Sequence, residues 1–164
     1  MNAVADLGVT FEQPGETLDD IAQIRRVTTS PISVDESLVT LQDAVRIAGD
    51  GIAEVFGIKL NRVGGLTKAR RMRDVAIAHG IQMFVMATGG SAMADIEASH
   101  LAQSIPDAFS RACWSCQDML TVDVSPNSGQ RCVDGLITID DTPGLGIAPD
   151  ESLLGEPVAV YQID

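Results

Sequence analysis

The sequence predicts an α/β fold in which parallel strands alternate with helices. Short apolar runs recur at a nearly constant interval, and the first three end close to the charged residues Glu12, Asp35 and Lys59. These residues are 23 and then 24 positions apart, which is about one strand, one helix and two loops. Such a repeat, with polar residues at the carboxyl end of each strand, is typical of parallel barrels and doubly wound sheets, which place their active sites there.

The elements follow one another in strict alternation. Strands are predicted at about residues 9–11, 32–34, 55–60, 82–86 and 108–114, and helices at 18–26, 41–48, 67–79 and 91–104. Thr17 is a candidate N-cap of the first helix, and Gly80 a candidate C-terminal glycine of the third. Pro106 marks the end of the fourth helical region. Because crossover helices return the chain in the same direction, this order predicts a parallel sheet.

The character of the sequence changes at about residue 120. Residues 125–129 and 142–146 are rich in Gly, Pro, Ser and Asn, and the apolar runs at 136–139 and 158–161 are short. We therefore divide the chain into an alternating part, residues 1–119, and a tail, residues 120–164. The tail is expected to be irregular, with one or two short strands, and to pack back on the alternating part.

Composition excludes several classes of function. A net charge of −12 argues against nucleic acid and against anionic membrane surfaces, since both need clustered Lys and Arg. No apolar stretch approaches the ~20 residues that span a bilayer, and the first residues lack the basic segment of a signal peptide. We expect a cytoplasmic protein. The basic residues between Lys68 and Arg73 are interpreted as a solvated helix face.

The three cysteines favour neither a disulfide framework nor a metal centre. Cys113 and Cys116 form a C-x-x-C pair, but a zinc site would need a second pair or histidines at ligand spacing. A thioredoxin-type motif would place its first cysteine at a helix N-terminus after an early strand, whereas this pair follows four repeat units. We interpret the pair as structural.

Carboxylates and a lysine at neighbouring strand ends can perform a specific reaction. Two carboxylates from adjacent parallel strands suit a hard divalent cation, Mg²⁺ in particular. A lysine beside that cation is favoured in its neutral form and can act as a base. Together they could take a proton from the carbon next to a carboxylate, with the metal stabilising the enediolate. On spacing alone, acidic residues after strands and an exposed Lys59 are an equally good explanation.

Three ordered motifs carry a resemblance to a known family. They are Phe-Glu-Gln-Pro at 11–14, Pro-Ile-Ser-Val-Asp-Glu-Ser at 31–37 and Gly-Ile-Lys-Leu-Asn-Arg-Val-Gly-Gly-Leu at 57–66. This run resembles the enolase superfamily, in the branch of mandelate racemase and muconate lactonizing enzyme, and so does Thr-Pro-Gly-Leu-Gly at 142–146. The resemblance covers nearly the whole chain. It implies the C-terminal part of a (β/α)7β TIM-like barrel, so that residues 1–119 would be a partial barrel.

The resemblance also implies roles for individual residues. Glu12 and Asp35 would be the second and third ligands of Mg²⁺, and Lys59 the acid/base on one face of the substrate. Glu36 would orient the metal site or Lys59 without touching the substrate. Gly64 and Gly65 would shape the turn into the next helix. The substrate would be a small carboxylate, an amino acid or hydroxy acid, and the full-length enzyme a homo-oligomer.

Parts of the family pattern are not found in this sequence. The first metal ligand, the Lys-x-Lys motif one strand earlier and the capping domain are missing, and residues 1–7 resemble the back half of a barrel helix. The sequence is therefore expected to be the C-terminal half of an enzyme and inactive alone. The alternative is a half-barrel that needs a partner or has no catalytic role.

Substrate specificity is predicted from the ends of the last two strands. Met-Ala-Thr-Gly-Gly-Ser at 86–91 and Cys-Trp-Ser-Cys-Gln-Asp at 113–118 resemble the cis-3-hydroxy-L-proline dehydratases most. Thr88, Gly89, Trp114 and Asp118 are the candidate substrate-binding residues; a core position for Trp114 is equally consistent with the sequence. The alternatives are a racemase or epimerase of amino acid derivatives, a sugar-acid dehydratase and a cycloisomerase. The Asp-x-Asp of dipeptide epimerases is absent, although Asp118 could take part of its role.

Overall fold

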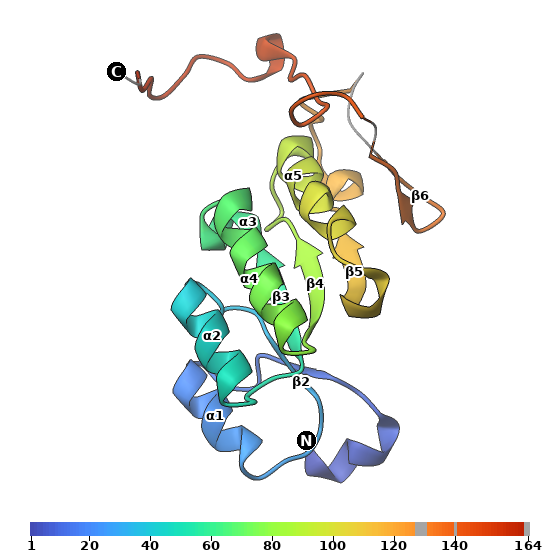
Figure 1. The fold of residues 1–164 in the computed structure, drawn as a ribbon. Helices are drawn as coiled ribbons and strands as arrows, with labels where there is room; N and C mark the ends of the chain where they lie inside the picture. Colours follow the sequence, from blue (N-terminus) through green and yellow to red (C-terminus); the bar gives the residue numbers. More distant parts are fainter. Residues whose placement is uncertain (127–130, 140, 163–164) are drawn as a thin grey trace.

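A five-stranded parallel sheet forms the centre of the molecule (Figure 1). The computed structural model describes residues 1–126, 131–139 and 141–162. The strands are adjacent in chain order: β1 (Phe11–Glu12), β2 (Ile32–Val34), β3 (Val55–Lys59), β4 (Gln82–Met86) and β5 (Ser110–Trp114). The helices between them are α1 (Leu18–Arg25), α2 (Leu41–Gly49), α3 (Leu60–Val63), α4 (Leu66–Ala78) and α5 (Ala92–Gln103). The α/β class and the parallel sheet are confirmed.

Local sequence explains where the first two long helices begin. Thr17 caps α1 in a capping box: its hydroxyl accepts the Asp20 amide at 3.1 Å, and the Asp20 carboxylate accepts the Thr17 amide at 3.0 Å. Thr40 and Asp43 repeat the arrangement at α2. Each box satisfies backbone donors that the first helical turn leaves without a partner. The same device therefore starts two successive helices at equivalent points of the repeat.

The two faces of the sheet differ in burial. Phe56 and Ile58 of β3, and Met83 and Val85 of β4, are fully buried and belong to the core formed with the helices. Residues of β4 that alternate with them, including Phe84, are only partly buried. Since successive side chains of a strand point to opposite faces, helices cover one face, and the other is more open. In the barrel that the resemblance implies, that second face would be the inside.

Most predicted elements are correct, with shifted ends. Strand β1 begins two residues later than predicted, and β5 begins at Ser110 because a 3-10 turn, Asp107–Phe109, precedes it. The helix expected over residues 1–7 is a 3-10 helix, Asn2–Leu7, that kinks at Val4. The side-chain amide of Asn2 donates to the Val27 carbonyl oxygen at 2.8 Å and so connects this helix to the loop after α1.

The short helix α3 follows β3 directly and was not predicted. It ends at Gly64, which has a φ of 86°, and Gly65 with a φ of 100° precedes α4. Side chains other than glycine rarely adopt such angles. A Cβ atom on Gly64 would also lie 3.0 Å from the Lys68 Nζ. These two glycines therefore turn the chain from β3 into α4, as the resemblance implied.

The tail is less regular than the sheet and its helices. A short antiparallel hairpin joins β6 (Cys132–Val133) to β7 (Leu136–Ile137), so one of the two expected strand regions is present. The other, residues 158–161, is not a strand: Val158 and Tyr161 are exposed and the segment runs away from the sheet (Figure 1). One contact to the alternating part is made where His100 Nε2 lies 3.3 Å from the Leu145 carbonyl oxygen. Among the described residues, no helix is both long enough and apolar enough to cross a bilayer.

Replacement of Phe56 by alanine should be the most damaging change on β3. Its side chain is fully buried between the sheet and the helices. Removal of such a ring leaves a cavity, and we expect the free energy of unfolding to fall by about 4 kcal/mol. Urea denaturation measures this, with Val45→Ala on the exposed face of α2 as the matched control. Equal effects of the two substitutions would contradict the assignment of Phe56 to the core.

Candidate active site at the strand ends

The register of the sheet places the predicted site residues along one edge. Glu12 ends β1, Asp35 directly follows β2, and Lys59 ends β3. Lys59 pairs with Met86 of β4, and Met86 pairs with Trp114 of β5. Residues in register on parallel strands point to the same face. Lys59 and Trp114 therefore flank Met86 on one face of the sheet, at its carboxyl edge.

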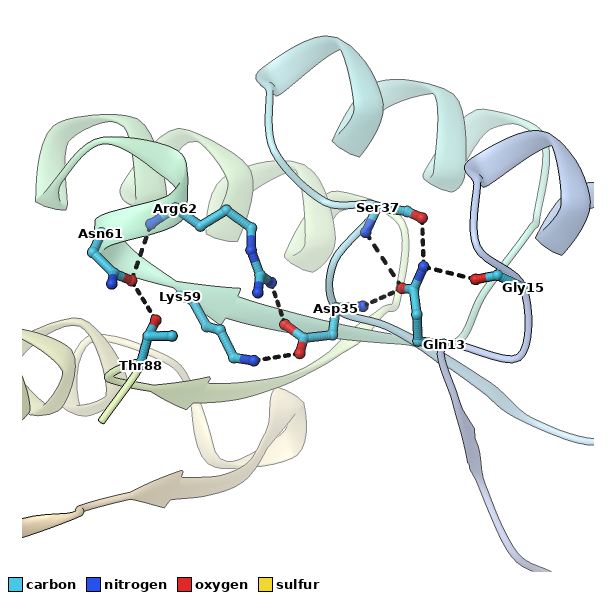
Figure 2. Close-up of polar contacts among 8 residues, drawn as sticks. All are labelled: Gln13, Gly15, Asp35, Ser37, Lys59, Asn61, Arg62 and Thr88. Atoms are coloured by element: carbon cyan, nitrogen blue, oxygen red, sulfur yellow. Dashed lines mark hydrogen bonds and ion pairs between the residues drawn. The ribbon is translucent and has the colours of Figure 1, made fainter. Parts of the chain in front are cut away.

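Asp35 is the centre of the polar network (Figure 2). Its side chain is only 4% exposed, and its two carboxylate oxygens accept separate cationic donors: Oδ2 accepts Lys59 Nζ, and Oδ1 accepts Arg62 Nη1. Lys59 and Arg62 are themselves largely buried, so solvent screens these charges weakly. The pairing brings Asp35 and Lys59 together, and it adds Arg62, which the sequence had not singled out.

Gln13 fixes the backbone that carries Asp35. Its amide oxygen accepts the backbone N–H groups of Asp35 at 3.0 Å and Ser37 at 3.3 Å, and its amide nitrogen donates to the Ser37 hydroxyl at 2.6 Å (Figure 2). Gln13 adopts a φ of 41°, which is unusual for a residue other than glycine. One side chain at the end of β1 thus orders the loop after β2.

The two remaining predicted carboxylates are exposed. Glu12 and Glu36 both face solvent, and the partners of the Asp35–Lys59 pair are Arg62 and Gln13. Within the described ranges no group of three or more His, Cys, Asp or Glu side chains lies close enough to hold a metal ion. Glu12 and Asp35 provide hard oxygen donors from adjacent strands, which suits Mg²⁺, and a third ligand would have to be added to them.

The predicted substrate-binding residues lie at the carboxyl ends of β4 and β5: Thr88 and Gly89 follow β4, and Trp114 is the last residue of β5. Thr88 donates its hydroxyl to the Asn61 Oδ1 at 2.5 Å, which links this loop to α3 (Figure 2). Gly89 is exposed and has a φ of 66°. Trp114 is 37% exposed, so it is not a core residue of the described chain. The side chain of Asp118 lies outside the described part of the structure.

The C-x-x-C pair is held as thiols. Burial is the main cause that raises the pKa of Cys113, and the contact with the Ser99 hydroxyl opposes it. Burial also raises the pKa of Cys116, and the neighbouring Asp95 carboxylate raises it further. Because the thiolate is the reactive and metal-binding form, both environments disfavour redox or ligand chemistry at neutral pH.

The fold and the site together define a class of protein. A parallel sheet covered by helices on one face, with a buried ion pair at the carboxyl edge of its strands, is typical of barrels that carry an active site at that edge. The model of the family described as "Enolase C-terminal domain-like" matches residues 1–153. The chain belongs to this family, in the mandelate racemase/muconate lactonizing enzyme branch of the enolase superfamily.

Relatives match nearly the whole of this chain, which covers less than half of each of them. A cis-3-hydroxy-L-proline dehydratase from Roseibium aggregatum is 39% identical over 98% of this chain and 44% of its own length. A solved structure from Silicibacter pomeroyi, provisionally assigned to the same branch, is 66% identical with a TM-score of 0.95, over 98% of this chain and 44% of its own. An enolase superfamily member from Roseovarius nubinhibens, solved with magnesium, is 44% identical with a TM-score of 0.89, over 94% and 42%. The chain therefore spans less than half the length of these relatives.

Proposed function

We propose that the protein containing this chain is a Mg²⁺-dependent enzyme that removes the proton next to a substrate carboxylate, with Lys59 as the base. The observation that carries the proposal is the pairing of Lys59 with Asp35 at the ends of neighbouring strands. We further propose that the reaction is dehydration of cis-3-hydroxy-L-proline. The 39% identity to a dehydratase of that name supports this substrate.

Two residues of this chain would hold the metal ion. Glu12 and Asp35 offer oxygen donors from adjacent strands, and the solved relative with magnesium supports the choice of ion. When bound, Mg²⁺ would neutralise the charge that develops on the substrate carboxylate. The third ligand would come from a barrel strand outside these 164 residues. Asp35 would then exchange part of its contact with Lys59 and Arg62 for the ion.

The proposed reaction assigns a simple part to each residue. The neutral amine of Lys59 accepts the proton from the substrate carbon next to the carboxylate, and the C–H electron pair moves toward the carboxylate. Return of that pair breaks the bond to the hydroxyl on the neighbouring carbon. One proton and one hydroxyl leave as water, and the unsaturated product tautomerises to an imino acid. Trp114 would form a wall beside the pyrrolidine ring.

The test uses the polypeptide translated from the complete reading frame that includes these residues. It is incubated in D2O with Mg²⁺ and cis-3-hydroxy-L-proline, and the substrate and product are followed by NMR. Dehydration that stops on removal of Mg²⁺ with a chelator supports the proposal. Exchange of the α-proton of another amino acid derivative without dehydration would instead favour a racemase or epimerase. Absence of both reactions would contradict the proposal.

We also infer that these 164 residues do not turn over the substrate alone. The support is the position of the two proposed metal ligands: Glu12 ends β1 and Asp35 follows β2, and the proposal assigns no third ligand within these residues. Two carboxylates hold Mg²⁺ weakly. The isolated chain should show no dehydration, and addition of the remaining barrel strands as a second polypeptide should restore it. Full activity of the isolated chain would contradict this inference.

Arg62 should affect the rate at which Lys59 accepts the substrate proton, because both residues bind Asp35. Two cations share the Asp35 carboxylate, so removal of one strengthens its pairing with the other. In Arg62→Met the Asp35 carboxylate pairs with Lys59 alone, so the Lys59 amine is less free to accept the substrate proton, and we expect about a tenfold lower kcat at neutral pH. Steady-state kinetics measures this, with Arg71→Met on the exposed face of α4 as the control. A kcat equal to that of the control would contradict the role.

A further inference from the structure

Asp95 is a fully buried carboxylate that belongs to none of the contacts described for Lys59. It lies in the first turn of α5 and has 0% exposure. Its Oδ2 accepts the Ser115 hydroxyl at 3.1 Å and the Cys116 backbone N–H at 3.0 Å, and the Cys116 thiol lies 3.4 Å from its Oδ1. A buried carboxylate is costly unless donors satisfy it, and here every one of these donors comes from the loop after β5.

The Cys116 thiol extends this contact to a second loop. Its sulfur also lies 3.7 Å from the carbonyl oxygen of Gly90, which precedes α5. Asp95 and Cys116 therefore join the loop after β4 to the loop after β5. The first loop carries Thr88 and Gly89, and the second follows Trp114 directly.

The strand geometry makes this junction important for Trp114. Cys113 points toward α5, where its sulfur lies 3.7 Å from the Ser99 hydroxyl. Trp114 therefore points to the opposite face, in the row that contains Lys59 and Met86. Ser115 and Cys116 follow Trp114 directly and are bound by Asp95 of α5. These contacts therefore fix the backbone that sets the direction of the indole ring.

We propose that Asp95 is a positioning residue for substrate recognition, which holds the loop after β5 against the loop after β4 and so fixes Trp114 as a wall of the substrate site. The inference rests on the proposed function for its substrate, a small α-amino carboxylate. Asp95 does not contact the reacting atoms. It acts on the binding of the substrate through Ser115 and Cys116, and leaves the chemistry to Lys59.

The Cys116 thiol provides a readout of the junction that does not depend on activity. Burial and the Asp95 carboxylate raise its pKa, so the thiol stays protonated and reacts slowly with alkylating agents. Loss of the carboxylate charge should speed its alkylation. Labelling with iodoacetamide followed by fragmentation mass spectrometry distinguishes Cys116 from Cys113.

Asp95→Asn is the first variant, made in the polypeptide from the complete reading frame. The amide keeps the shape but has one acceptor oxygen in place of two, so at least one loop donor loses its partner. We expect about a tenfold rise in the KM for cis-3-hydroxy-L-proline, a kcat within about threefold of the original, and about tenfold faster alkylation of Cys116. A purely structural role would lower the amount of folded enzyme and leave the KM unchanged.

Ser99→Ala is the matched control. It removes a different buried polar group of α5, a hydroxyl that donates to the Asp95 carbonyl at 2.8 Å and contacts Cys113, but it leaves the contacts of the Asp95 carboxylate in place. Its KM and its Cys116 alkylation should stay within about twofold of the original protein. If Asp95→Asn behaves like this control in both measurements, the proposal is overturned.

Ser115→Ala keeps the proposal testable if Asp95→Asn does not fold. It removes a single donor to Asp95, and we expect the KM to rise about threefold; an unchanged KM overturns the proposal. Failure of the original protein to dehydrate the hydroxyproline overturns the proposed function instead. In that case the alkylation of Cys116 decides on the junction itself: faster alkylation in Asp95→Asn supports it, and an unchanged rate overturns it.

Discussion

Lys59→Ala should abolish exchange of the substrate α-proton while Mg²⁺ still binds. Lys59 is the one amine that lies at the carboxyl edge of the sheet beside a predicted metal ligand in the described structure. Without it no side chain of this row can accept the proton, and we expect the rate of exchange to fall roughly 10³-fold. Glu12 and Asp35 remain in place, so the metal affinity should change little. NMR in D2O follows the exchange, and Mn²⁺ binding by electron paramagnetic resonance follows the metal site.

The control for this prediction is another lysine that the chain offers. Lys68 lies on α4, is exposed, and has no part in the polar network around Asp35. Lys68→Ala should exchange the α-proton at the original rate. If Lys59→Ala also retained turnover near the original rate, the base would have to be a different residue. If Lys59→Ala lost both proton exchange and metal binding, the substitution would have disrupted the whole site and not the base alone.

The sequence predicted the repeat because local signals and tertiary structure agree in this chain. The Thr17 capping box, the left-handed Gly80 after α4 and the apolar runs of the strands each occur where the parallel sheet needs them. The ends of β1 and β5 were less predictable. Apolar residues such as Val9 continue beyond the paired backbone, and only the neighbouring strand decides where pairing begins.

The site was predicted in part. The interval between Asp35 and Lys59 indicated that they would meet at adjacent strand ends, and they do. Arg62 was missed because α3 was missed: one helical turn after β3 brings residue 62 back over residue 59. A second basic residue three positions after the lysine was the available signal. Gln13 was missed because its role depends on a left-handed backbone that glycine usually adopts.

Residues 158–161 show the limit of reading strands from apolar runs. Val158, Val160 and Tyr161 have the composition of a strand, and yet they are exposed and unpaired with the sheet in the described structure. A strand forms only where a neighbour accepts its backbone hydrogen bonds. The short run at 136–137 has such a neighbour in Cys132 and Val133, and it does form a strand.

Asp35→Asn should be the substitution that costs both stability and activity. Asp35 is nearly fully buried and its carboxylate binds two cations, so the amide would leave Lys59 and Arg62 facing each other without an anion. Removal of one member of a buried ionic group costs about 3 kcal/mol of unfolding free energy. Under the proposed function the change also removes a metal ligand, and dehydration should fall to the background rate. Urea denaturation and the NMR assay measure the two effects separately.

An ion pair on the surface tests whether burial is the reason for the large loss of stability expected in Asp35→Asn. Asp19 accepts Arg46 at 2.5 Å, yet the two side chains are 74% and 45% exposed. Because water and salt screen such a pair, Asp19→Asn should cost less than about 1 kcal/mol and leave turnover unchanged. The same chemical change should then cost much more stability at the buried site than at the exposed one. Equal losses of stability at the two sites would show that Asp35 is not the buried centre of the network, and the assignment of Lys59 as the base would lose its structural support.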